Sequence, residues 1–200
     1  MKDVKLLSFK KESIPNILSL SRIFSIPLIV GLFVLQDLSS SMSSCLNYLI
    51  FAIFTIVCST DYLDGYLARS MNCTTLFGAL VDQIADKLVV ISTFFCMVVF
   101  NKIWWIKLNF VPIIILVLRE VFVSGLREFV SAKGLKISSS NAGKVKTFFQ
   151  MVSLACLLLF NDFDSFGHKV GVLLTWVACF FSAWSAVDYA NKSKPAFSEK

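Results

Sequence analysis

Four aspartates stand at regular intervals within an otherwise apolar part of the chain: Asp61, Asp64, Asp82 and Asp86. Their spacings, i to i+3 and i to i+4, place side chains on one face of an α-helix. Two helices joined by a tight turn would therefore aim all four carboxylates at one another. Facing carboxylates repel strongly at low dielectric unless cations neutralise them. Hard divalent cations such as Mg²⁺ or Mn²⁺ prefer oxygen ligands, so the spacing predicts a site for one or two such ions.

The residues between these aspartates complete a longer pattern, D-x2-D-G-x2-A-R-x8-G-x3-D-x3-D, which runs from Asp61 to Asp86 with every fixed position filled. With this pattern the chain resembles the CDP-alcohol phosphatidyltransferase family, whose signature it is. A solvated helix face is the alternative explanation for acidic residues at helical spacing. We disfavour it because the flanking sequence is strongly apolar.

The resemblance implies transfer of a phosphatidyl group from a CDP-lipid, with release of CMP. In that chemistry Asp61, Asp64 and Asp82 would ligate the divalent cations that clamp the pyrophosphate oxygens. Asp86 is either the general base that accepts the proton of the acceptor alcohol or a further metal ligand, and both roles stay open. The resemblance also implies a six-helix fold that forms a homodimer, and three residues that help to bind the CDP moiety: Gly65, Arg69 and Gly78.

The first apolar segment carries Asn16, Ser19 and Arg22 at intervals of three residues, on one helical face. The run PNILSLSR resembles the opening of phosphatidylglycerophosphate synthases, a branch of the same family, with Ser19 in the place of the usual threonine. We expect Asn16 and Arg22 to contact the CDP-lipid. The alternative for Arg22 is a side chain that reaches the membrane interface.

A basic group occurs in the second half of the chain: Arg119, Arg127, Lys144 and Lys146. The two arginines are roughly 80° apart around a helix, and the lysines open the next predicted helix, whose N-terminal end favours anions. The stretches REVFVSGLRE and GKVKT resemble phosphatidylglycerophosphate synthases, which implies that this group binds the phosphate of sn-glycerol 3-phosphate. Positive charge that only sets membrane topology is the alternative.

Composition predicts the scaffold. Of 200 residues, 56% are hydrophobic and 16% are charged, and the mean hydropathy is +0.75. Soluble domains contain about a quarter charged residues. We therefore expect an all-α integral membrane protein, one domain over residues 1–200, with a short interfacial helix at residues 2–12. Six transmembrane helices are predicted: residues 14–35, 46–69, 75–100, 110–129, 142–160 and 170–189.

The net charge of +6 is explained by topology rather than by nucleic acid as a partner. With the N-terminus in the cytoplasm, every basic residue falls on the cytoplasmic side except Lys102, Lys107 and Lys169, as the positive-inside rule requires. We expect a multi-pass protein of the bacterial inner membrane, with both termini and the active site facing the cytoplasm and membrane lipids around it. The six scattered cysteines and the single His168 disfavour zinc sites and histidine triads.

Two alternatives to a phosphatidyltransferase that uses glycerol 3-phosphate remain open. One is a sister phosphatidyltransferase that uses serine, inositol phosphate or phosphatidylglycerol. The other is a small ion or proton transporter with intramembrane carboxylates. A transporter has no need of a basic anion site, and this favours the enzyme.

Overall fold

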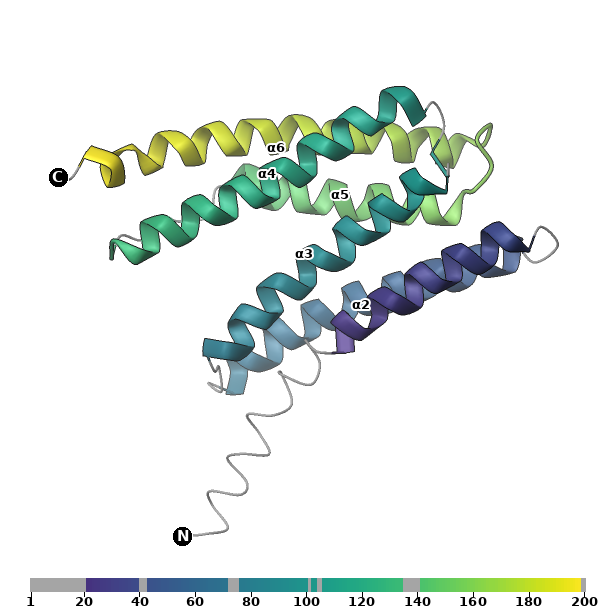
Figure 1. Cartoon of the computed structure of the whole chain (residues 1–200), viewed down its shortest axis with the longest axis horizontal. Helices are drawn as coiled ribbons and strands as arrows, with labels where there is room; N and C mark the ends of the chain where they lie inside the picture. The colour runs from purple at the N-terminus through teal and green to yellow at the C-terminus, as the bar shows by residue number, and fades with distance from the viewer. Residues whose placement is uncertain are drawn as a thin grey trace, which may run out of the picture. The chain divides into compact units, whose positions relative to one another are not determined.

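The computed structural model describes residues 21–39, 43–71, 76–100, 102–103, 106–134 and 141–198, and within these ranges every regular element is an α-helix (Figure 1). The helices are Ser21–Leu38, α2 (Ser43–Met71), α3 (Leu76–Val99), α4 (Ile106–Ala132), α5 (Asn141–Leu159) and α6 (Phe166–Ser198). They form two compact units, residues 1–100 and 101–200, which are described separately.

The all-α membrane fold predicted from composition is confirmed. Three of the described helices are long and apolar enough to cross a bilayer by themselves: Ser21–Leu38, Ala142–Leu159 within α5, and Phe166–Lys194 within α6. A shorter apolar stretch, Ser44–Thr60, occupies α2 ahead of the motif. The six predicted helices are therefore present, but in the described ranges only half of them meet the length and hydropathy of a span. The predicted interfacial helix at residues 2–12 lies outside the described residues.

Several predicted helix ends were wrong. The first helix reaches Leu38 and α2 begins at Ser43, so the connection expected over residues 36–45 is shorter. The predicted connection 101–109 was too long, because α4 already begins at Ile106. The largest difference is α6, whose 33 residues extend it to about 50 Å, well beyond a hydrocarbon core of about 30 Å. The helix thus continues beyond the predicted end at residue 189, through Ser198.

The first unit joins the Ser21–Leu38 helix to α2 and to the end of α3. Near the short connection, Gln36 Nε2 donates a hydrogen bond to Asn47 Oδ1 at 2.5 Å. The ring of Phe33 stacks on that of Phe100, with centroids 5.9 Å apart. Both contacts tie the last turns of the first helix to the start of α2 and the end of α3. The aspartate motif lies toward the other ends of these two helices, at the end of α2 and the start of α3.

In the second unit, α5 and α6 form an antiparallel hairpin (Figure 1). Ser153 Oγ and Thr175 Oγ1 are hydrogen-bonded at 2.6 Å, and the rings of Phe149 and Phe181 stack at 5.9 Å. A Cβ at Gly171 would lie 2.9 Å from Leu157 Cγ, so this position brings the two helices close. Each of these buried hydroxyl groups thus has a hydrogen-bond partner within the apolar contact between the two helices.

The same unit places α4 beside α6. Contacts pair Arg119 with Ser185 and Arg127 with Tyr189, so residue numbers rise together and the two helices run in the same direction. The helix α4 ends where Gly134 takes the left-handed conformation, with φ of 75°, and its amide donates to Ser131 O at 2.9 Å. Glycine is suited to this C-terminal cap. The up-down-up order of α4, α5 and α6 agrees with successive membrane crossings.

Candidate functional site

The aspartate motif lies on two helices of the first unit, as predicted. The helix α2 continues without a break through Asp61 and Asp64 to Met71, and α3 begins at Leu76, ahead of Asp82 and Asp86. Five Cα–Cα steps of about 3.8 Å bring the two helix ends within about 19 Å of each other. Both halves of the motif therefore lie on helical backbone, as the spacing of the aspartates predicts.

Most side chains of the motif lie outside the described part of the structure, and so does Asn16. This applies to six predicted site residues: Asp61, Asp64, Gly65, Arg69, Gly78 and Asp82. Asp86 is described and is partly buried on α3. Among the described side chains, no group of three or more His, Cys, Asp or Glu residues gathers around a common point, and of the four aspartates only the side chain of Asp86 is among them. The metal site stays a prediction.

Arg22 is the described member of the N-terminal group, and it is deeply buried in the first unit. Its side chain is 2% exposed, although it lies at the start of the described part of its helix. Ser25 Oγ donates to the carbonyl oxygen of Arg22 at 2.6 Å. A side chain that reached the membrane interface would be expected to be more exposed. The burial favours a binding or packing role over topology alone.

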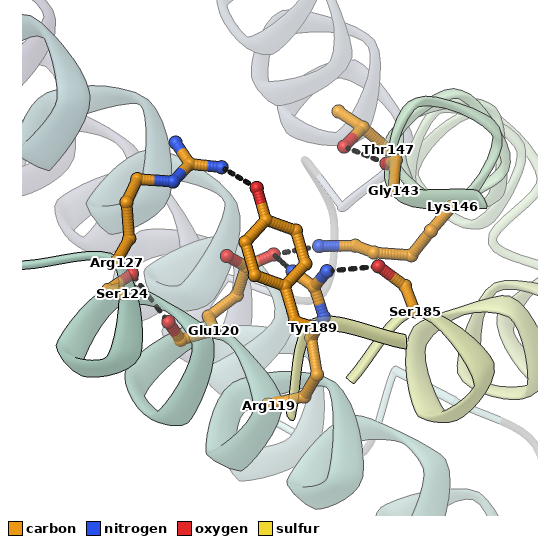
Figure 2. Close-up of polar contacts among 9 residues, drawn as sticks. All are labelled: Arg119, Glu120, Ser124, Arg127, Gly143, Lys146, Thr147, Ser185 and Tyr189. Carbon is orange, nitrogen blue, oxygen red and sulfur yellow. Dashed lines mark hydrogen bonds and ion pairs between the residues drawn. The ribbon is translucent and has the colours of Figure 1, made fainter. Parts of the chain in front are cut away.

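The basic group of the second unit is gathered by three helices (Figure 2). Arg119, on α4, donates from Nη2 to Ser185 Oγ of α6 at 2.7 Å, and its Nη1 lies 3.7 Å from Glu120 Oε1. Its side chain is 10% exposed. Nε of Arg119 is buried without a hydrogen-bond partner among the described residues. Such a buried N–H is costly, so this edge of the guanidinium is suited to an acceptor oxygen of a ligand.

Arg127 lies two turns further along α4 and also contacts α6. Its Nη2 lies 3.1 Å from the hydroxyl oxygen of Tyr189 and donates to it, and its guanidinium carbon lies 5.7 Å from the centre of the same ring. Tyr189 is 2% exposed, whereas Arg127 is exposed. The tyrosine thus holds the guanidinium at a fixed place while leaving donors open to solvent or ligand.

The two lysines of α5 differ sharply. Lys144 is exposed, whereas the side chain of Lys146 is 2% exposed and its Nζ forms an ion pair with Glu120 Oε1. Figure 2 shows Lys146 reaching from α5 toward Glu120 on α4. Three of the four residues predicted to bind the acceptor phosphate are therefore brought toward one region of the unit: Arg119, Arg127 and Lys146. Within the described part of the chain, Lys144 forms no hydrogen bond or ion pair with these residues, and all four assignments remain predictions.

Comparison with known proteins agrees with the sequence pattern. A model of the CDP-alcohol phosphatidyltransferase family matches residues 12–184. The chain belongs to this family. Similar proteins include one from Rickettsia bellii, 32% identical over 93% of this chain and 98% of its own length. Another is from Haemophilus influenzae, 36% identical over 92% of this chain and 95% of its own. Both are named CDP-diacylglycerol–glycerol-3-phosphate 3-phosphatidyltransferase. A protein from Salmonella choleraesuis with the same name is 35% identical over 91% of this chain and 95% of its own length.

Sequence reasoning missed two residues that contact the arginines of the basic group. Ser185 and Tyr189 lie one turn apart on α6, just beyond the segment that the family model matches. The available signal was the occurrence of hydroxyl groups at i and i+4 in an apolar helix. Their partners Arg119 and Arg127 are 66 and 62 residues away in sequence, so local spacing could not pair them. In this phosphatidyltransferase, α6 thus provides the hydroxyl groups to which the two arginines of α4 donate.

Proposed function

We propose that the chain transfers the phosphatidyl group of CDP-diacylglycerol to sn-glycerol 3-phosphate, giving phosphatidylglycerophosphate and CMP. The observation that carries the proposal is the complete aspartate pattern on two consecutive helices, α2 and α3. The names of relatives that align over more than nine tenths of the chain support the same reaction. The enzyme is a membrane-embedded transferase of phospholipid biosynthesis.

Asp61, Asp64 and Asp82 are the residues that would hold one or two divalent cations, Mg²⁺ or Mn²⁺. Members of the family generally depend on a divalent cation, and carboxylate oxygens are the donors these hard ions prefer. When bound, the metal neutralises charge on the pyrophosphate and on the CMP that leaves. Gly65, Arg69 and Gly78, with Asn16 and Arg22 in the first helix, are assigned to the CDP-lipid.

The reaction forms one bond and breaks one. The 1-hydroxyl oxygen of glycerol 3-phosphate attacks the phosphorus that carries the diacylglycerol, and the pyrophosphate bond to CMP breaks. Asp86 takes the hydroxyl proton if it is the base, or joins the metal ligands if it is not. Its partly buried position on α3 is compatible with both roles. The neutral hydroxyl group of the acceptor thereby becomes part of a phosphodiester, without a change in oxidation state.

Arg119, Arg127 and Lys144 are assigned to the phosphate of the acceptor. The orphaned Nε of Arg119 and the outward donors of Arg127 support this assignment, because guanidinium groups match the geometry of phosphate oxygens. A phosphomonoester carries close to two negative charges at neutral pH. The arginines therefore favour an acceptor that carries a phosphate over one that carries only hydroxyl groups.

Placement in the membrane follows from charge. The helices identify a membrane protein, and the relatives are bacterial. The distribution of basic residues supports an inner-membrane location with the termini and the aspartate motif on the cytoplasmic side, where water-soluble substrates are made. A homodimer is part of the proposal on the family resemblance alone.

A panel of acceptors tests the function. Purified protein in mixed micelles with CDP-diacylglycerol and Mg²⁺ is given glycerol 3-phosphate, serine, inositol phosphate or phosphatidylglycerol in turn, and CMP release is measured. We expect CMP only with glycerol 3-phosphate, in equal amounts to phosphatidylglycerophosphate. The matched control is Asp64→Asn, which should release none. CMP release that is faster with another acceptor would reassign the enzyme within its family.

A further inference from the structure

Glu120 lies between two cations of the second unit, and the two contacts differ (Figure 2). Lys146 Nζ pairs directly with Oε1 of Glu120, while Arg119 Nη1 is 3.7 Å from the same oxygen. The side chains are 2%, 15% and 10% exposed for Lys146, Glu120 and Arg119. A lysine this deeply buried requires a counter-ion, because an unpaired buried charge is strongly destabilising. Glu120 supplies it from the neighbouring helix.

The helical geometry of α5 separates the two lysines that the sequence places together. Residues two positions apart differ by roughly 200° around a helix axis, so Lys144 and Lys146 occupy opposite faces of α5. The exposures agree, since Lys144 is exposed and Lys146 is buried. One ligand therefore does not engage both lysines from the same side of this helix.

The charges of the cluster also balance without Lys146. Glu120 offsets Lys146 in the ion pair, and two positive charges remain, those of Arg119 and Arg127. This matches the charge of a phosphomonoester dianion. Glu120 also borders Arg119, which Ser185 holds from the other side, so the carboxylate helps to fix the orientation of that guanidinium.

We infer that Lys146 is a structural cation and not a ligand of the acceptor phosphate, and that Glu120 is a positioning residue. Through its ion pair Glu120 ties α4 to α5, and through Arg119 it sets the direction of the guanidinium that binds the acceptor. The part of this inference that concerns acceptor binding rests on the proposed function. The part that concerns the ion pair does not.

A double-mutant cycle tests the inference. Glu120→Gln, Lys146→Met and the double variant are purified in the same detergent as the wild-type protein. Thermal midpoints are measured, together with rates of CMP release as glycerol 3-phosphate and CDP-diacylglycerol are varied in turn. Lys144→Met is the matched control, a second lysine neutralised on the opposite face of α5.

Each single variant removes one partner of the buried ion pair between Glu120 and Lys146, so its thermal midpoint should fall. Where protein survives, its KM for glycerol 3-phosphate should rise at least about tenfold with the KM for CDP-diacylglycerol unchanged. The double variant removes both charges of that pair and keeps an oxygen beside Arg119. It should recover both the midpoint and, to within about threefold, the acceptor KM. Lys144→Met removes an exposed charge on the other face of α5 and should not lower the midpoint.

Two results would overturn the inference. If the double variant regains its midpoint but not its use of glycerol 3-phosphate, Lys146 itself binds the phosphate. If the double variant is as unstable as the weaker single variant, or does not fold, the pair is not a lock between α4 and α5. Failure of the proposed function looks different, because the wild-type protein would then give no CMP with glycerol 3-phosphate while the stability cycle still reports on the ion pair.

Discussion

The hydroxyl group of Tyr189 on α6 lies 3.1 Å from Nη2 of Arg127 on α4, and the guanidinium carbon lies 5.7 Å from the centre of the same ring. The tyrosine is 2% exposed and the arginine is exposed. A rigid, buried aromatic side chain thus anchors a long, flexible cation that would otherwise lose rotamer entropy on binding a ligand. On the proposed function, Tyr189 holds Arg127 in place for the phosphate of the acceptor.

The first prediction concerns this anchor. Tyr189→Phe removes the hydroxyl group but keeps the ring, so Arg127 loses one hydrogen bond and retains the aromatic contact. A hydrogen bond of this kind contributes about 0.5–1.5 kcal/mol. The KM for glycerol 3-phosphate should therefore rise about two- to twelvefold, with the KM for CDP-diacylglycerol unchanged, in kinetics that vary each substrate separately.

Two variants control that experiment. Ser185→Ala removes the corresponding support of Arg119 and should have a similar effect on the acceptor KM. Ser193→Ala removes a hydroxyl that bonds only to the carbonyl oxygen of Tyr189, one turn along the same helix, and should leave the acceptor KM unchanged. Equal effects of all three variants on both substrates would assign Tyr189 to the packing of α6 rather than to Arg127.

Local features of this chain were predictable, and long-range partners were not. Asp61 and Asp64 are at helical spacing and indeed lie on one continuous helix, because the spacing of a pattern is set within a few residues. The partner of Arg127 is 62 residues away, on a helix that is apolar on nearly all sides and so offers no polar face to single it out. The different roles of Lys144 and Lys146 likewise depend on which face of α5 meets α4, and tertiary packing decides this.

The second prediction concerns the chemistry of Arg127. Arg127→Gln removes the positive charge and should lower kcat/KM for glycerol 3-phosphate at least about tenfold, since a hydrogen bond to a charged group contributes about 1.5–3 kcal/mol. Arg127→Lys should also be impaired, because an ammonium group does not reproduce the planar, two-pronged donor. Arg69→Gln should instead impair use of CDP-diacylglycerol. A loss in Arg127→Gln that is equal for both substrates would speak against an acceptor role.

The third prediction concerns the metal. Activity should disappear in EDTA and return when Mg²⁺ or Mn²⁺ is added in excess, because we propose that the aspartates of α2 and α3 bind such cations. Asp64→Asn should be almost inactive, with an unchanged thermal midpoint, since removal of one charge from a crowded set of carboxylates relieves repulsion. Full activity in the presence of chelator would rule out the metal-dependent mechanism.

The fourth prediction concerns topology. Lys133 follows α4 and Asp164 precedes α6, and both side chains are exposed. In a cysteine-free background, Asp164→Cys should react with an impermeant maleimide in intact spheroplasts, whereas Lys133→Cys should react only in opened membranes. The single crossing of α5 between these positions requires opposite sides. Labelling of both positions from the same side would mean that α5 does not cross the membrane.

The last prediction concerns the close approach of α5 and α6. A Cβ at Gly171 would lie 2.9 Å from Leu157 Cγ and 3.2 Å from Cys156 Cβ, so Gly171→Ala forces the helices apart and should cost about 1–3 kcal/mol of stability. Gly31→Ala is the matched control, because a Cβ there meets nothing within 4 Å and alanine favours a helix. Thermal midpoints in one detergent should fall for Gly171→Ala and stay level or rise for Gly31→Ala. An unchanged midpoint in Gly171→Ala would show that the hairpin has space for a methyl group at this position.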